Sequence, residues 1–235
     1  RTQQNVTLYE LGAIYISREE NITKQPDEQL RLAGAITGLW VSHPWQKEEK
    51  PVDFYVLKGI VEGLFEQLKL NGVEYVATPL ENMHPGRTAT IHINGEHVGF
   101  LGQIHPALQK KLDLTDTYVF DLDLEYILSL VTEEIGFTPI PKYPSITQDL
   151  AFVVAEETPA SHIINVIQQA AGKHLKEVNV FDIYQGEHME PGKKSIAFSL
   201  RFQNPDATLT DEEINKAREN IVNEVEEQFQ AELRG

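Results

Sequence analysis

Three prolines within six residues divide this chain more sharply than any other feature of its sequence. Pro139, Pro141 and Pro144 each fix the backbone angle φ and remove a hydrogen-bond donor, so the segment is expected to be extended. We interpret residues 139–144 as a linker. It separates a first predicted domain at 1–138 from a second predicted domain at 145–235.

Downstream of the linker, the predicted elements follow the order β-α-β-β-α-β, which is the ferredoxin-like order and belongs to the α+β class. Thr158 followed by Pro159 is typical of a helix N-cap with proline at the first helical position. Thr210 and Glu213 have the spacing of a capping box that opens the second helix. The expected strands are at 146–155, 175–184, 193–203 and 233–234, and the expected helices are at 158–173 and 210–230.

Before the linker, the pattern is that of a mainly antiparallel sheet with helices packed on it, again the α+β class. Alternating aromatic and β-branched residues predict strands, and Asn94-Gly95 is the sequence of a type I′ hairpin turn. Asp53 is expected to cap a helix with an apolar stripe. The expected strands are at 6–17, 29–38, 74–79, 88–93, 97–104 and 118–124, and the expected helices are at 53–70, 106–112 and 124–133.

The charge of the chain restricts how it can bind nucleic acid. Its 36 acidic residues outnumber its 20 Lys and Arg, for a formal net charge of −16. Because non-specific phosphate binding relies on a basic face, any RNA contact must rest on a local patch and on base recognition. The absence of cysteine excludes disulfides, thiolate metal sites and cysteine nucleophiles. No apolar stretch is long enough to span a bilayer and no secretion leader is evident, while Arg1 suggests a fragment or a processed chain.

Two neighbouring strands of the second domain bring together side chains that suit a single-stranded base. Asp182 and Tyr184 are two residues apart in a strand, so they share one face of the sheet. Ser195, near the start of the next strand, is expected close to them. An aromatic ring beside hydrogen-bonding groups is how single-stranded bases are held, and a carboxylate suits the N–H donors of guanine. The same residues are also compatible with a solvated sheet face that binds nothing.

Residues 193–203 predict a local basic patch, because they include Lys193, Lys194 and Arg201 and no acidic residue. These three side chains are candidate contacts to RNA phosphates. An ordinary charged turn is the competing interpretation.

Other kinds of site have less support. None of the eight histidines forms a pair with the i, i+4 spacing of a helical metal site, so no metal ligand is predicted. Asp116, Asp121 and Asp123 are expected to form a solvated strand end, and Arg87 to make a structural ion pair or a subunit contact. A small-molecule-binding regulatory domain on a ferredoxin-like fold is the alternative function. It needs glycine-lined pockets, however, and Gly172 is explained as a helix C-cap.

The second domain resembles the ferredoxin-fold anticodon-binding domain of phenylalanyl-tRNA synthetases. The matching segments are YPSITQDLAFVV at 143–154, VFDIYQG at 180–186, GKKSIAF at 192–198, TLTDEE at 208–213 and the terminal Leu233-Arg234. The first domain is similar to the domain that precedes it in the bacterial β subunit, through LYELGAIY at 8–15, MHPGRTA at 83–89 and VGFLGQIHP at 98–106. In the family, that preceding domain has a class II synthetase fold without catalytic power.

The resemblance implies the C-terminal end of a β subunit of an enzyme that ligates phenylalanine to tRNA-Phe with ATP. In the family, the anticodon guanine stacks on a tyrosine and bonds to an aspartate and a serine, and Tyr184, Asp182 and Ser195 match these positions. Arg234 is a further candidate for an anticodon contact. The implied partners are tRNA-Phe and the α subunit, in a cytoplasmic α2β2 assembly without a membrane. Activation, with ATP and Mg, belongs to the α subunit, so no catalytic residue, cofactor or metal is expected in this chain.

Overall fold

A computed structural model describes residues 3–17, 19, 21, 23–132, 140–186 and 189–234 of the chain. The chain divides into two compact units, Arg1–Ile135 and Gly136–Gly235, each with its own hydrophobic core. Both units combine antiparallel sheet with helices, so the predicted α+β class is confirmed. Of the predicted linker, Pro139 lies outside the described residues, and residues 140–145 form neither helix nor strand. The domain limits at 138 and 145 stay predictions.

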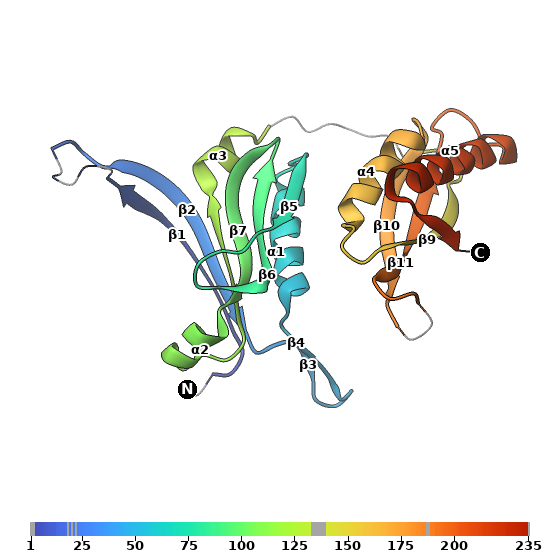
Figure 1. The fold of residues 1–235 in the computed structure, drawn as a ribbon. Helices are drawn as coiled ribbons and strands as arrows, with labels where there is room; N and C mark the ends of the chain where they lie inside the picture. The colour runs from blue at the N-terminus through green and yellow to red at the C-terminus, as the bar shows by residue number, and fades with distance from the viewer. Residues whose placement is uncertain are drawn as a thin grey trace. The chain divides into compact units, whose positions relative to one another are not determined.

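The first unit is built on a six-stranded antiparallel sheet. Its strands are β1 (Val6–Ile16), β2 (Asp27–Thr37), β5 (Val73–Ala77), β6 (Met83–Ile93), β7 (Glu96–Ile104) and β8 (Thr117–Asp123), and its helices are α1 (Phe54–Gln67), α2 (Pro106–Leu112) and α3 (Leu124–Ser129). The strands lie in the order β1-β2-β8-β7-β6-β5, so β1 and β5 are the two edges. Figure 1 shows β1 and β2 continuing past the other strands as a long hairpin.

The core of this unit forms where α1 meets the sheet. Asp53 caps the helix as predicted, since its Oδ1 accepts a hydrogen bond from the backbone N–H of Val56 at 2.7 Å. Below the cap, Leu57, Val61 and Phe65 follow the helical period and are buried in the core. The periodicity of the sequence therefore decides which face of α1 packs on the sheet.

The predicted turn at Asn94-Gly95 is confirmed, because both residues have the positive φ that a type I′ turn needs, 54° and 84°. Other elements differ from expectation. Strand β6 begins at Met83 instead of 88, and α1 ends at Gln67 instead of 70. Helix α3 ends at Ser129 instead of 133, and Glu133 lies outside the described residues. A small hairpin of β3 (Leu39–His43) and β4 (Glu48–Pro51) was not predicted. No residue of its strands is buried, although β3 contains Trp40 and Val41, residue types that favour strands.

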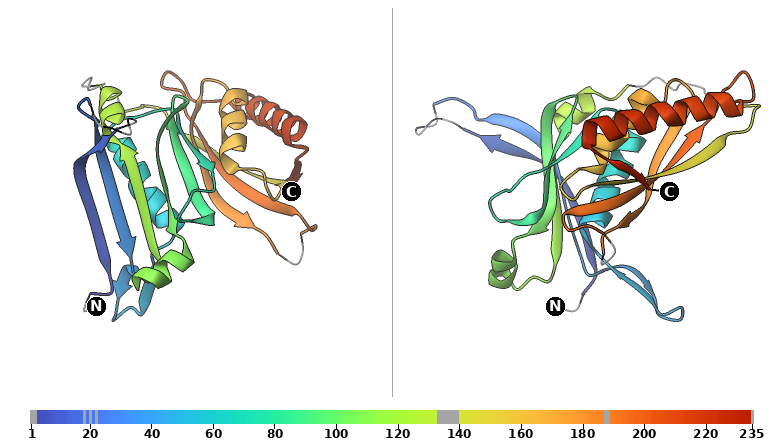
Figure 2. Two further views of the ribbon diagram at one scale, coloured as in Figure 1. Left: turned by 60° about the vertical axis from the view of Figure 1, so that its left-hand side comes forward. Right: turned by 45° about the vertical axis from the view of Figure 1, so that its right-hand side comes forward.

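The second unit has the predicted β-α-β-β-α-β order. Its elements are β9 (Ile146–Ala155), α4 (Ala160–Ala170), β10 (Leu175–Tyr184), β11 (Lys193–Phe202), α5 (Asp211–Phe229) and β12 (Glu232–Arg234). The strands pair antiparallel in the order β10-β11-β9-β12, which places β10 and β12 at the edges. Helices α4 and α5 pack together against one face of this sheet (Figure 2). No described helix of this unit covers the other face, which we call the open face.

The two helices of this unit begin differently, since α5 has a side-chain cap at its N-terminus and α4 has none. The capping box of α5 is confirmed, because the N–H of Glu213 donates to Thr210 Oγ1 while the N–H of Thr210 donates to the Glu213 carboxylate. That second bond holds the pKa of Glu213 below its usual value. The expected cap of α4 at Thr158 is wrong. Pro159 is the N-cap instead, without a side-chain bond, and the N–H of Thr158 closes a turn onto the carbonyl of Ala155.

Among the described residues, no helix has both the length and the apolar character needed to cross a membrane.

Candidate nucleic-acid interface

The open face of the second sheet is defined by the alternation of side chains along β11. Ile196 and Phe198 are fully buried in the core beneath the helices. Ala197, which lies between them, and Ser195, which precedes Ile196, therefore point to the open face.

Asp182 and Tyr184 lie on the same face as Ser195, as predicted. Residues directly opposite each other in an antiparallel pair share a face, and Tyr184 is opposite Ser195 while Asp182 is opposite Ala197. The ladder is irregular between Val180 and Asp182 but regular from there to Tyr184. Ser195 is only 4% exposed although no described helix covers it. The Asp182 carboxylate is exposed and makes no hydrogen bond or ion pair with any described residue.

Arg234 reaches this group from the opposite edge of the sheet. Strand β12 pairs with β9, which places Arg234 opposite Ala151 on the open face. Its guanidinium carbon is 5.6 Å from the centroid of the Tyr184 ring, within the range of a cation–π contact. An aromatic ring, a carboxylate, a hydroxyl and a guanidinium thus converge on one part of the open face.

Acidic residues from other segments lie against two of the three cations of the predicted basic patch at 193–203. Lys193 Nζ is 2.8 Å from Glu190 and 3.3 Å from Glu232, and these hydrogen bonds raise the pKa of the Lys193 ammonium group. Arg201 Nε is 2.8 Å from the carboxylate of Glu177. The pKa of Glu177 is lowered in turn, mainly by a hydrogen bond from Asn179 and then by Arg201.

Lys194 does not lie beside Tyr184. It is opposite Val154, a buried core residue of β9, so it stands on the helix side of the sheet. Contacts of Lys193, Lys194 or Arg201 with RNA phosphates stay predictions. The cation that the structure places beside the Tyr184 ring is Arg234.

Ala151 and Ala197 were not singled out from the sequence, yet they form the floor between these side chains. A row of directly opposite residues runs across all four strands on the open face: Asp182, Ala197, Ala151 and Arg234. The signal that could have found Ala197 is the regular alternation of small and large residues in SIAFSL at 195–200. It indicates one crowded face and one shallow face of the same strand.

Both units match known families. Residues 141–234, which include all four converging side chains, match the ferredoxin-fold anticodon binding domain. Residues 1–124 match the CLM domain of the phenylalanyl tRNA synthetase beta chain. The chain belongs to the phenylalanyl-tRNA synthetase beta chain family.

Relatives in this family align over the whole chain. The phenylalanine–tRNA ligase beta subunit of Bacillus licheniformis is 52% identical, that of Bacillus subtilis 50% and that of Geobacillus kaustophilus 47%. All of this chain is covered in each case, but it spans only 29% of the length of each relative. Among solved structures, a pyrrolysyl tRNA synthetase from Desulfitobacterium hafniense aligns over 54% of this chain and 41% of that chain at 16% identity. Its TM-score of 0.38 is too low to support an inference.

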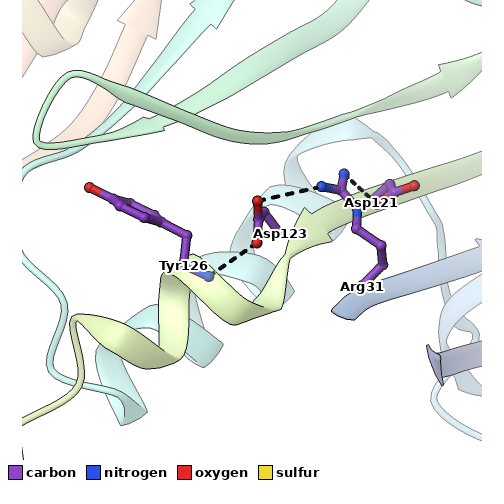
Figure 3. A network of polar contacts seen from close by, with 4 residues as sticks. All are labelled: Arg31, Asp121, Asp123 and Tyr126. Carbon is purple, nitrogen blue, oxygen red and sulfur yellow. Dashed lines mark hydrogen bonds and ion pairs between the residues drawn. The ribbon is translucent and has the colours of Figure 1, made fainter. Parts of the chain in front are cut away.

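In this member of the synthetase beta chain family, the acidic cluster of the first unit is a structural ion network. Arg31 lies 2.7 Å from Asp121 and 4.0 Å from Asp123, and the other oxygen of Asp123 accepts the N–H of Tyr126 at the start of α3 (Figure 3). The side chains of Asp121 and Asp123 are 37% and 30% exposed, so this end of the strand is partly solvated as expected, but both carboxylates are paired. Their charges are used to join β2 and β8 and to cap α3.

The remaining polar residues of interest in the first unit also have structural partners. Arg87 donates to Gln103 Oε1 at 2.8 Å, and Gln103 Nε2 donates to Asp116 at 2.9 Å. Gln103 is buried, so both hydrogen bonds satisfy a polar group in the interior. Within the described residues, no group of three or more His, Cys, Asp or Glu is arranged to hold a metal ion.

Proposed function

We propose that the second unit of this chain binds the anticodon of tRNA-Phe and that the first unit contacts the synthetase α subunit. The observation that carries the first part is the convergence of Asp182, Tyr184, Ser195 and Arg234 on the open face. The family match over the same residues supports it.

Each of these side chains has a distinct role in the proposal. The Tyr184 ring stacks on an unpaired base, an interaction that tolerates any base because every base has a π-face. Selection for guanine therefore rests on hydrogen bonds to the edge of the base. The Asp182 carboxylate, which has no partner among the described residues, accepts from two adjacent guanine N–H groups, whereas adenine lacks this pair of donors. The Ser195 hydroxyl supplies a further donor or acceptor.

The charge distribution favours approach of the RNA from the open face. Helix α5 begins with Asp211, Glu212 and Glu213 and packs on the opposite face of the sheet, where phosphates would be repelled. The open face presents Arg234, while Lys193 and Arg201 are paired with acids. Affinity consequently depends on stacking and edge contacts more than on net charge.

The activity of the whole enzyme is part of the proposal. Because the chain spans 29% of the length of its relatives, ligation of phenylalanine to tRNA-Phe is assigned to the complete α2β2 enzyme in the cytoplasm. ATP and Mg bind to the α subunit in this scheme. The present chain supplies anticodon recognition and a subunit contact, and no catalytic residue.

A small-molecule regulatory function is not favoured. The hollow at the turn after α4, beside Gly172, has a volume of about 210 Å³, below the roughly 300–1,000 Å³ usual for small-molecule pockets. A larger hollow of about 530 Å³ lies between α4 and α5, but no glycine is among its lining residues, so it is not the glycine-lined pocket that this function needs. Gly172 itself follows the helix with a φ of 76°, so its conformation is explained by the C-terminal cap.

Anticodon reading is tested by a two-dimensional NMR titration of the 235-residue chain with the tRNA-Phe anticodon stem-loop at low salt. We expect amide shifts confined to the strands around Asp182, Tyr184 and Ser195. A stem-loop with its first anticodon base changed from guanine is the control, and its shifts should be weaker. Shifts scattered over lysines and equal for both loops would show generic phosphate contact and refute base recognition.

The subunit contact is assigned to β1, one of the two edges of the six-stranded sheet. Large apolar side chains are exposed on both of its faces, which is unusual for an edge strand that faces water. They are Leu8, Tyr9, Leu11, Ile14, Tyr15 and Ile16, with exposed fractions from 39% to 80%. A surface of this kind fits an apolar partner surface, and the family supplies the α subunit as that partner.

Replacing Tyr9 by glutamate should weaken assembly of the β subunit with the α subunit by about tenfold or more, the size typical of an aromatic anchor at an interface. Tyr9 is 80% exposed, so the fold of the free chain should be unaffected. Analytical ultracentrifugation of the mixed subunits measures the change. Val76→Glu, at the other edge of the same sheet and also exposed, is the control. Equal behaviour of the two variants would rule out β1 as the contact.

A further inference from the structure

The contact between Arg234 and Tyr184 spans an unusual distance across the sheet. The two residues come from β12 and β10, its opposite edges, with β9 and β11 between them. Three strand spacings amount to about 14 Å, yet the guanidinium carbon lies 5.6 Å from the ring centroid. Both side chains must therefore lie low over the two central strands.

The central strands carry small side chains at three of the four positions around this contact. Ala151 and Ala197 lie in the same row as Arg234, and Ser195 and Val153 lie in the same row as Tyr184. The low exposure of Ser195 is consistent with cover from the Tyr184 ring, since the described helices lie on the other face. The shallow floor is what lets the edge residues meet.

We propose that Ala197 is a positioning residue of the anticodon site, because its methyl side chain keeps open the space in which Arg234, Tyr184 and the bound base come together. This inference rests on the proposed function and adds a determinant to it. Ala197 is directly opposite Asp182 and next along its face from Ser195, so it adjoins both hydrogen-bonding groups. A longer side chain there would stand between Arg234 and Tyr184 and crowd the Asp182 carboxylate.

The matched pair of variants for the test is Ala197→Leu and Ser199→Leu in the 235-residue chain. Ser199 is the next residue of β11 on the open face and is also half-buried, but it lies opposite Asn179 and Asp149, away from the contact. Binding of the tRNA-Phe anticodon stem-loop is measured by fluorescence anisotropy. We expect Ala197→Leu to raise Kd by about 5- to 150-fold, the factor that corresponds to one lost base stack. Ser199→Leu should change Kd by less than about twofold.

A readout without RNA tests the same geometry. In the free chain, the Tyr184 ring should shift the NMR signals of the Arg234 side chain, and Ala197→Leu should abolish this ring-current shift while Ser199→Leu keeps it. Ala197→Val is the milder variant should leucine impair folding, because β-branched residues suit strands. Ala197→Val should weaken binding of the stem-loop and reduce the ring-current shift, each by less than Ala197→Leu does.

The possible failures can be told apart. Unchanged Kd and unchanged Arg234 signals in a folded Ala197→Leu or Ala197→Val chain would overturn the positioning role, and so would an equal loss in Ser199→Leu. If Tyr184→Ala also left binding unchanged, the proposed anticodon site itself would be refuted, and the inference with it. If Tyr184→Ala weakened binding of the stem-loop and the Ala197 variants did not, the positioning role of Ala197 would be refuted and the proposed anticodon site would stand.

Discussion

Replacing Tyr184 by alanine should raise the Kd for the tRNA-Phe anticodon stem-loop by about 5- to 150-fold. A base stacked on an aromatic side chain contributes about 1–3 kcal/mol, and each 1.4 kcal/mol corresponds to about a tenfold change in Kd. The variant also removes the partner of Arg234, whose guanidinium lies against the ring in the free protein. In the intact synthetase, the KM for tRNA should rise while activation of the amino acid is unaffected.

The matched control is Tyr184→Phe, which keeps the ring and should bind within a few-fold of the unmodified chain. Thermal unfolding checks that both variants are folded. Binding that is equally strong in Tyr184→Ala would contradict the stacking role. A parallel loss of amino-acid activation in the intact enzyme would contradict a role confined to the anticodon.

Replacing Phe152 by alanine should lower the free energy of unfolding of the second unit by about 3–5 kcal/mol, the usual cost of removing a buried phenylalanine. Phe152 is fully buried on the central strand β9, and its ring centroid is 6.3 Å from that of Phe198. Small domains are stable by about 5–15 kcal/mol, so the loss takes a large part of the total. The change in the free energy of unfolding is measured by urea unfolding, with hydrogen exchange in peptides from β9 and β11 as the signal for this unit.

Phe181→Ala is the control for this experiment. The same residue type stands on edge strand β10 with 58% of its surface exposed, so truncation should cost less than about 1 kcal/mol. A Phe152→Ala chain that is no less stable than Phe181→Ala would show that the packing around β9 does not hold this unit together.

The secondary structure of the second unit could be predicted closely because its signals are local. Strands β9 and β10 have the predicted ends, and the capping box of α5 is present as expected. Two predictions failed. The N-cap of α4 is Pro159 instead of Thr158. In the first unit, the β3–β4 hairpin was missed, and its second strand, Glu48–Pro51, is wholly exposed and has no alternation of apolar residues.

The candidate site could be predicted in part. The two-residue period of a strand was enough to place Asp182 and Tyr184 on one face, and the order of the strands brought Ser195 beside them. The charges were misjudged, because the acids that lie against Lys193 come from the β10–β11 connection and from the last strand. Counting charges within residues 193–203 could not reveal partners that lie elsewhere in the chain.

The sequence alone determined most of the elements of this protein, its α+β class and three of the four side chains that converge on the open face, while the family resemblance added Arg234 as a candidate. These depend on periodicity, caps and turns, which act over a few neighbouring residues. Only the tertiary structure decided that Arg234 crosses the sheet to Tyr184, that Arg31 ties Asp121 to Asp123, and that Ala197 lies in the floor between the site residues. Such contacts join residues far apart in the chain, so they depend on strand order and register and not on local sequence.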